Sequence, residues 1–154
     1  MWVPTDYYFE QELLGESEDS VSSPFIGVLA DTYLALAVAP FPGLNRGTLL
    51  GAFTEPTFPG YARKELVWQL PYFGLNGLWN LEALAVHWQP TANVSGNLIL
   101  GAMIVTAASG GMLLMAITLP GSGRDMSNIQ NALTAIARFG KDPLANWGDL
   151  GQVD

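Results

Sequence analysis

The sequence predicts an all-β domain, a jelly roll or a related antiparallel β-sandwich. Ten prolines and seventeen glycines divide the chain into short apolar runs. Turn-forming motifs separate most of these runs, among them PFPGLNRG, EPTFPG and QPTANVSG. Short apolar segments between Gly- and Pro-rich turns are typical of sandwiches and barrels, because a strand needs only about five or six residues.

Seven segments have the length and composition of strands. In EALAVHW, the side chains of Leu84, Val86 and Trp88 share one face of the expected strand. The run YLALAVA is small and apolar on both faces, which is typical of a strand covered on both sides. We expect strands at residues 25–30, 33–39, 48–53, 61–70, 81–88, 97–105 and 112–119.

An eighth segment, near residues 127–139, fits two structures. Ile129, Leu133 and Ile136 fit one face of a short helix. Alternation around Leu133 and Ala135 fits a strand equally well. Periodicity therefore leaves a short helix and a strand both open for this segment.

The chain length indicates one domain with an extension at each end. The expected sandwich covers residues 24–140, and residues 141–154 form a Gly-rich surface tail. Residues 1–23 form an acidic arm, because the first twenty residues hold six acids and no base. Four aromatic residues of this arm are expected interaction residues that reach a neighbouring chain. They are Trp2, Tyr7, Tyr8 and Phe9. The alternative is an arm that folds on its own domain or stays loose.

Charge and composition exclude several classes of function. The net charge of −8 argues against a nucleic-acid partner, because phosphate binding needs a basic field. The chain has no cysteine, which excludes disulfides and thiolate chemistry. The start MWVPTDYYFEQE lacks the basic and apolar regions of a secretory signal, so we expect synthesis in the cytoplasm without export.

The uncharged stretch Leu98–Leu119 is long enough to span a bilayer. A buried hairpin is the favoured interpretation, since the segment AASGG supplies a turn at its centre. Gly110 and Gly111 are the expected turn residues, because glycine adopts positive φ angles without strain. We therefore expect no membrane partner.

No residue pattern indicates catalysis, a cofactor or a metal site. The single histidine, His87, lies inside an expected strand and is interpreted as a structural or surface residue. The acidic segment GESEDS lacks the pattern of a calcium loop, and GSGRD lacks the Lys-Ser/Thr of a phosphate loop. No feature of the sequence singles out two of the glutamates Glu55, Glu65 and Glu82 as a catalytic pair. We expect that this chain is not an enzyme and that it has no catalytic, cofactor-binding or metal-binding residue.

Two longer motifs remain, FTEPTFPGYAR at residues 53–63 and LGAMIVTAASGGMLLMAITLP at residues 100–120. Together with YLALAVAPFPG they resemble small virion proteins of tailed bacteriophages, of the capsid decoration or cement type. The resemblance covers a little over half of the chain and does not include the acidic arm or the possible helix. It implies a β-sandwich on the virion capsid surface, with the major capsid protein as partner and a homo-oligomer, expected as a trimer.

The segment GYAR also has a direct physical interpretation. Gly60 permits a tight reversal of the chain, and Tyr61 lies at the end of the expected sheet. The guanidinium of Arg63 is suited to clamp a carboxylate, with Glu55 and Glu65 as candidates, or backbone carbonyls in a turn. A clamp within the chain's own fold is favoured over an intermolecular contact. Tyr61 and Arg63 join the arm aromatics as expected interaction residues.

The sequence and the resemblance thus predict a structural virion protein that stabilises contacts between capsomers. The alternatives are a carbohydrate- or receptor-binding β module, a small β-sandwich hydrolase with paired carboxylates, and a membrane-anchored protein. Five tryptophans and five tyrosines keep the carbohydrate-binding alternative open.

Overall fold

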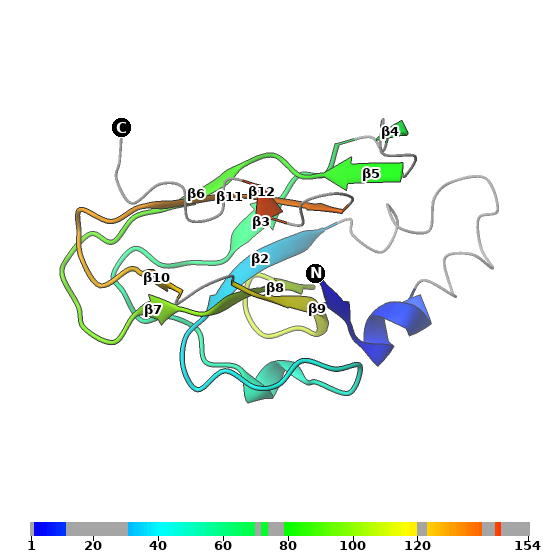
Figure 1. Ribbon diagram of the computed structural model, residues 1–154, viewed down its shortest axis with the longest axis horizontal. Coiled ribbons are helices and arrows are strands. Elements are labelled where there is room, and N and C mark those ends of the chain that lie inside the picture. Colours follow the sequence, from blue (N-terminus) through cyan, green and yellow to red (C-terminus); the bar gives the residue numbers. More distant parts are fainter. Residues whose placement is uncertain are drawn as a thin grey trace.

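The computed structural model describes residues 2–11, 31–69, 72–73, 79–119, 123–139 and 144–145. Most regular structure in these residues is antiparallel strand, arranged in two layers (Figure 1). The predicted all-β class and antiparallel sandwich are therefore confirmed, whereas the jelly-roll topology stays a prediction. The strand expected at 25–30 lies outside the described residues.

The strands are short, as the spacing of glycines and prolines predicts. In chain order they are β1 (Val3–Pro4), β2 (Thr32–Ala37), β3 (Lys64–Leu66), β4 (Tyr72–Phe73), β5 (Trp79–Glu82), β6 (Val86–Trp88), β7 (Leu98–Ile99), β8 (Gly101–Val105), β9 (Leu113–Thr118), β10 (Arg124–Asp125), β11 (Leu133–Phe139) and β12 (Leu144–Ala145). Residues 6–11 are helical, and η1 (Leu50–Ala52) is a short 3-10 helix.

Two sheets form the layers. The first has the order β1-β9-β8-β2-β3, and the second has the order β12-β11-β5-β4, with β6 also paired to β11. In Figure 1 the second sheet lies above the first. The chain after β3 passes from one sheet to the other, since Trp68 bridges to Ala83 and the Leu84 N–H donates to the Val67 carbonyl at 2.9 Å. The strand predicted at 61–70 is thus divided between the two sheets.

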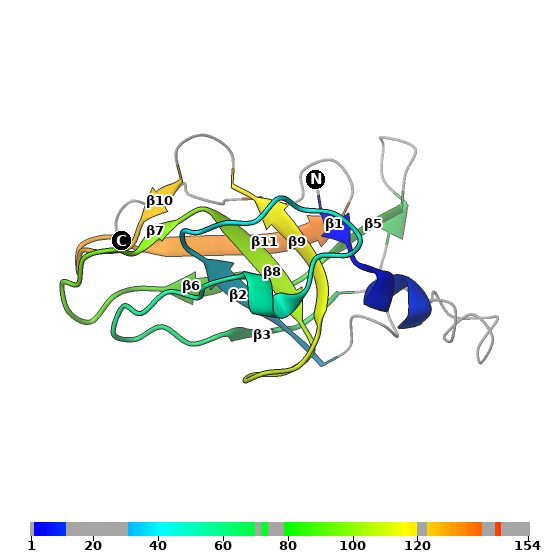
Figure 2. The same ribbon diagram turned by 90° about the horizontal axis from the view of Figure 1, so that it is seen from below.

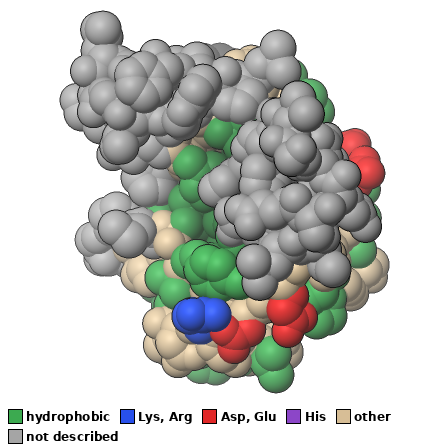
Figure 3. All heavy atoms as spheres, turned by 90° about the vertical axis from the view of Figure 1, so that its right-hand side faces the viewer, with side chains coloured by type: hydrophobic (Ala, Val, Ile, Leu, Met, Phe, Trp, Pro, Cys, Tyr) green, Lys and Arg blue, Asp and Glu red, His purple; other side chains and the backbone are tan. Residues whose placement is uncertain are grey.

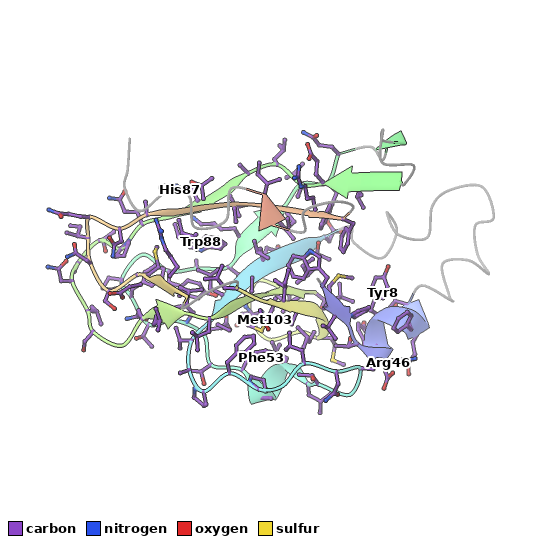
Figure 4. The ribbon with its side chains drawn as sticks, viewed as in Figure 1. Tyr8, Arg46, Phe53, His87, Trp88 and Met103 are labelled. Atoms are coloured by element: carbon purple, nitrogen blue, oxygen red, sulfur yellow. The ribbon has the colours of Figure 1, made fainter. Side chains whose placement is uncertain are left out.

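The main core lies between the sheets. Alternate residues of β2, Leu34 and Leu36, point inward with Ile104 of β8 and Leu133 of β11, and all four are fully buried. Trp88 on β6 is 1% exposed, and its side chain lies between the two layers (Figure 4). Large side chains at period two therefore hold the layers together.

The first sheet has a second apolar face, which is also covered. Ala35 of β2 and Met103 of β8 are buried there, under Phe41 and Phe53 of the segment that follows β2. The rings of Phe41 and Phe53 meet edge to face, with their centroids 5.6 Å apart. Figure 2 views the molecule from below and shows this segment passing across the outer face of the first sheet. The expectation that YLALAVA is covered on both sides is confirmed.

The prediction of a strand at residues 48–53 is wrong. The segment forms η1 instead, in which the Ala52 and Phe53 N–H groups donate to the Leu49 and Leu50 carbonyls at 3.1 Å. A helical turn places residues three apart on one side, whereas a strand places them on opposite faces. Leu50 and Phe53 therefore both pack on the outer face of the first sheet and cover its apolar residues.

The hairpin predicted within Leu98–Leu119 is confirmed. Strands β8 and β9 pair in antiparallel register from Gly101↔Thr118 to Val105↔Leu113. The turn residues Gly110 and Gly111 have φ angles of 66° and 81°, the left-handed region that glycine favours. Among the described residues, no helix has the length and apolar character needed to cross a membrane.

The segment left open between helix and strand is a strand. β11 pairs with β5, β6 and β12, so its backbone groups are used on both edges. Leu133, Ala135 and Ala137 are buried, and the residues between them are half-buried. The pairing of β12 with β11 places Leu144–Ala145 of the expected surface tail in the second sheet.

The described part of the N-terminal arm folds on its own domain, which was the alternative to docking on a neighbour. β1 pairs with β9, and the Thr5 N–H donates to the Leu114 carbonyl at 2.9 Å. The Thr5 hydroxyl then caps the following helix by accepting from the Tyr8 N–H at 3.4 Å. Apolar surface on the arm is thereby buried within the same chain.

We expect Gly101→Ala to lower the free energy of unfolding by about 1–3 kcal/mol, as overpacking does in a filled core. A Cβ at Gly101 would overlap the Phe41 ring and lie 2.5 Å from the Ile117 carbonyl oxygen. The measurement is urea unfolding followed by tryptophan fluorescence.

Gly43→Ala is the matched control, because a Cβ at Gly43 meets no atom within 4 Å. It is expected to change the free energy of unfolding by less than about 1 kcal/mol. Equal effects of the two substitutions would contradict the close packing of the 41–53 segment on the first sheet.

Candidate functional site

The motif FTEPTFPGYAR builds a polar cluster of three side chains. Arg63 donates from Nε to Glu55 Oε1 at 3.0 Å and from Nη2 to Glu55 Oε2 at 2.9 Å. The Tyr61 hydroxyl donates to the same Glu55 Oε1 at 2.6 Å. The Arg63 side chain is 7% exposed and that of Glu55 is 30% exposed, so the ion pair is largely screened from water. The predicted carboxylate clamp is present, with Glu55 rather than Glu65 as its partner.

The remaining donor of Arg63 holds the tip of the β8–β9 hairpin. Its Nη1 donates to the carbonyls of Ala107 at 2.8 Å and Gly110 at 2.7 Å. Across the turn, the Met112 N–H donates to the Thr106 hydroxyl at 2.8 Å. Arg63 therefore binds both the carboxylate and the turn carbonyls that the sequence offered as alternatives.

The Tyr61 hydroxyl accepts a hydrogen bond from the edge of β2, beyond the point where β3 ends. β3 pairs with β2 only as far as Leu34↔Lys64. Beyond that point the Leu36 N–H donates to the Tyr61 hydroxyl at 3.2 Å, and the Val38 N–H donates to the Thr54 carbonyl at 2.8 Å. The motif thus satisfies backbone donors that β3 leaves unpaired.

The rest of the motif is equally enclosed. Gly60 has a φ angle of 94°, which confirms the expected left-handed turn. Phe58 is 2% exposed, and its ring meets the Tyr61 ring edge to face at 5.4 Å. The Trp88 indole N–H donates to the Ala62 carbonyl at 2.7 Å. Each residue from Phe58 to Arg63 therefore has a place in the chain's own fold.

The cluster shifts the pKa of its members. Burial opposes ionisation of Glu55, yet the hydrogen bonds from Arg63 and Tyr61 hold the pKa of this carboxyl below its ordinary value. Burial, together with the hydrogen bond to Glu55, raises the pKa of Tyr61. The hydrogen bond to Glu55 raises the pKa of Arg63. At neutral pH the cluster holds one paired positive and one paired negative charge, which is a structural arrangement.

A groove of about 390 Å³ lies beside the hairpin tip. Its walls are the helix start at residues 5–7, the loop at residues 46–51 and the hairpin at residues 111–113. Two apolar side chains at this groove are well exposed, Leu49 at 70% and Met112 at 44%. No sequence pattern indicated this groove, because its walls come from three distant segments and Leu49 was expected in a strand.

An ion pair lies at one end of the groove. Arg46 Nε donates to Asp6 Oδ1 at 2.9 Å, and the Arg46 guanidinium lies over the Phe9 ring at 4.5 Å from its centroid. Both partners are exposed, Arg46 at 66% and Asp6 at 60%. Figure 3 views this end of the molecule and shows a basic group beside acidic groups, next to hydrophobic surface.

The structure places the predicted interaction residues mostly inside the chain. Trp2 and Tyr8 are 6% and 2% exposed and belong to the main core, which corrects the expectation that they reach a neighbour. Tyr7 and Phe9 are half-buried against the same core. Burial of these rings on their own domain removes their apolar surface from water, which stabilises the folded arm.

The other candidate groups have structural partners. His87 is exposed on the second sheet, with Nδ1 2.8 Å from the Thr134 hydroxyl across the β6–β11 pair (Figure 4). Glu82 lies 3.8 Å from Arg138. Within the described residues, no three His, Asp or Glu side chains form a group that could hold a metal ion.

Comparisons with protein-family models, with curated proteins and with solved structures found no match to this chain.

We expect Glu55→Gln to lower the free energy of unfolding by about 2–4 kcal/mol, because it leaves the buried Arg63 charge without its counter-charge. The measurement is urea unfolding at neutral pH. Glu65→Gln is the control, because Glu65 is exposed and lies on the adjacent strand β3. It is expected to change stability by less than about 0.5 kcal/mol.

The same comparison tests the lowered pKa of Glu55. A carboxyl with a lowered folded-state pKa stabilises the fold above its ordinary value of 4.5, and this contribution is lost as the pH falls through the folded-state value. The stability difference between the wild type and Glu55→Gln is therefore expected to shrink under acid. A difference that stays constant down to the acid-unfolding range would contradict the ionised clamp.

Proposed function

We propose that this chain is a structural virion protein, a capsid decoration or cement protein that binds the outer surface of a tailed-bacteriophage head. The observation that carries the proposal concerns the motif that resembles this class. In FTEPTFPGYAR, the polar groups of Glu55, Tyr61 and Arg63 bind one another, the edge of β2 and the tip of the β8–β9 hairpin. Such a motif stiffens a scaffold, which is what a protein with a mechanical role requires.

The surface composition supports the same function. Only 13% of residues are charged, about half of the share in ordinary soluble domains. Apolar side chains are exposed on several parts of the molecule, where they are suited to contacts with a shell. They are Leu49, Val67, Leu84, Leu98, Met112 and Ile129.

The action would be mechanical. Burial of apolar area against the major capsid protein contributes about 25 cal/mol per Å², from which the cost of association is subtracted. Repetition over a symmetric shell multiplies weak contacts into firm attachment. A chain that bridges neighbouring capsomers in this way raises the work needed to separate them. In this proposal the protein is made in the host cytoplasm and ends on the virion surface.

A carbohydrate-binding face has less support. Trp2 and Trp88 are buried, and the half-buried Trp68 uses its indole N–H on the Thr32 hydroxyl at 3.0 Å. These described tryptophans therefore do not form the exposed row of aromatics that sugar binding requires.

The test requires the phage genome that encodes this chain. The purified chain is added to heads that were assembled without it from the major capsid protein of the same phage. We expect saturable co-sedimentation with a fixed copy number per capsomer, and a higher disruption temperature of the decorated heads. Buried apolar contacts repeated over the lattice are the reason for both results. Mass spectrometry of purified virions is expected to detect the chain in the particle.

Heads incubated with an unrelated acidic β-domain serve as the control for non-specific adsorption. Absence of the chain from mature virions, together with no binding to the heads, would contradict the proposed function.

A further inference from the structure

We propose that the outer face of the second sheet is a docking site for the segment that follows β12 in the same chain, residues 146–154, with Trp147 as the anchor. The structure describes β12 as far as Ala145. The proposal concerns the isolated chain and does not rest on binding to a phage head.

The outer face of the second sheet carries exposed apolar side chains. The Leu84 N–H donates to the Val67 carbonyl at 2.9 Å, so these two residues lie opposite one another. The next pair along, Trp68 and Ala83, packs on the main core, and alternation therefore turns Val67 and Leu84 outward. Both are well exposed, Val67 at 53% and Leu84 at 49%.

β11 continues this apolar row across the sheet. The Ala83 N–H donates to the Ala137 carbonyl at 2.9 Å, which places Ile136 beside Leu84. Ala137 is buried, so the preceding residue, Ile136, points outward, where it is half-buried. An apolar row therefore runs over the outer face from Val67 to Ile136.

β12 brings the chain to the edge of this row. It pairs with the second edge of β11, with Ala145 opposite Ile136. Two further residues in the same register place Trp147 opposite Thr134, on the face that Ile136 shares. An indole ring there reaches Ile136 diagonally and extends over β11 to Leu84, since diagonal neighbours on a sheet face lie within reach of an aromatic side chain.

The chemistry around this position suits an indole. The ring buries its apolar body on the row, and its N–H needs an acceptor at the edge of the contact. The Thr134 hydroxyl, which lies 2.8 Å from His87 Nδ1, is such an acceptor. Gly148 follows Trp147 directly and lets the chain turn away after the anchor, because glycine is conformationally permissive.

Tethering favours this segment over a separate partner. Trp147 follows Ala145 by two residues, so its effective concentration at the face is of millimolar order or higher. Residues 12–30, the other long segment outside the described part, lead into β2 of the first sheet. That segment also carries four acids, which are disfavoured beside the exposed Glu65 at the rim of this face.

Docking of residues 146–154 would also narrow the surface that can meet a shell in the proposed function. Val67 and Leu84 are then covered by their own chain. Leu49 and Met112, on the opposite side of the molecule beside the groove, remain exposed.

The test is a double-mutant cycle in urea unfolding of the purified full chain, followed by circular dichroism. Trp147→Ala is expected to raise the equilibrium constant for unfolding at least about tenfold, because the apolar contacts of the ring are lost. Leu84→Ala removes part of the same contact. The equilibrium constant of the double variant is therefore expected to fall at least about threefold below the value for independent effects.

Leu49→Ala is the matched control, because Leu49 is an exposed leucine beside the groove and far from the second sheet. Its effect and that of Trp147→Ala are expected to combine independently, within about twofold.

Fluorine NMR of the chain labelled with 5-fluorotryptophan gives a second readout that does not rely on stability. The Trp147 resonance is identified by its loss in Trp147→Phe. We expect Leu84→Ala to shift this resonance and Leu49→Ala to leave it in place.

Unchanged stability in Trp147→Ala would overturn the proposal, as would equal coupling of Trp147 to Leu84 and Leu49. Coupling that appears only at concentrations where sedimentation detects a dimer would place the segment on a second copy, which also overturns it. None of these results alters the measured binding to phage heads, so the two proposals fail independently.

Discussion

The shared carboxylate of Glu55 is the contact on which the organisation of the first sheet depends. It accepts two hydrogen bonds from Arg63 and one from Tyr61, and these two residues reach the hairpin tip and the edge of β2. A buried ion pair gives little net stability relative to a well-packed apolar pair, but the loss of one partner is costly. The cluster therefore serves mainly to specify one arrangement of three separate chain segments.

The cover of the first sheet explains how the surface of the molecule arises. Small residues of β2 and β8 leave room for Phe41, Leu50 and Phe53 to pack on the outer face of the sheet. The loop that carries these anchors also displays the exposed Leu49 side chain beside the hairpin tip. The loop that covers the first sheet thus also forms one wall of the apolar groove. The Arg63 clamp holds the β8–β9 hairpin, which forms another wall. Stability and surface shape have the same origin in this fold.

The fold class could be predicted from the sequence, whereas some local elements and the groove could not. The covering of YLALAVA on both faces, the paired glycines at 110–111 and the clamp at Arg63 were all predicted, because each follows from local composition, local spacing or local chemistry. The 3-10 turn at η1 was not, since the same residues suit a strand until the sheet that needs cover is known. The N-terminal helix carried a signal, Thr5 as cap before Asp6, which the acidic composition obscured. The groove joins three distant segments, and periodicity contains no information about such a juxtaposition.

Amide hydrogen exchange in Tyr61→Phe is the sharpest test of how the Glu55–Tyr61–Arg63 cluster supports the edge of β2. The Leu36 N–H would lose its acceptor, whereas the Val38 N–H on the same edge of β2 keeps the Thr54 carbonyl. We expect protection of the Leu36 amide to fall by about tenfold or more relative to that of Val38, which corresponds to about 1.4 kcal/mol or more for one unsatisfied buried donor. Equal protection of the two amides in this variant would contradict the role assigned to the Glu55–Tyr61–Arg63 cluster.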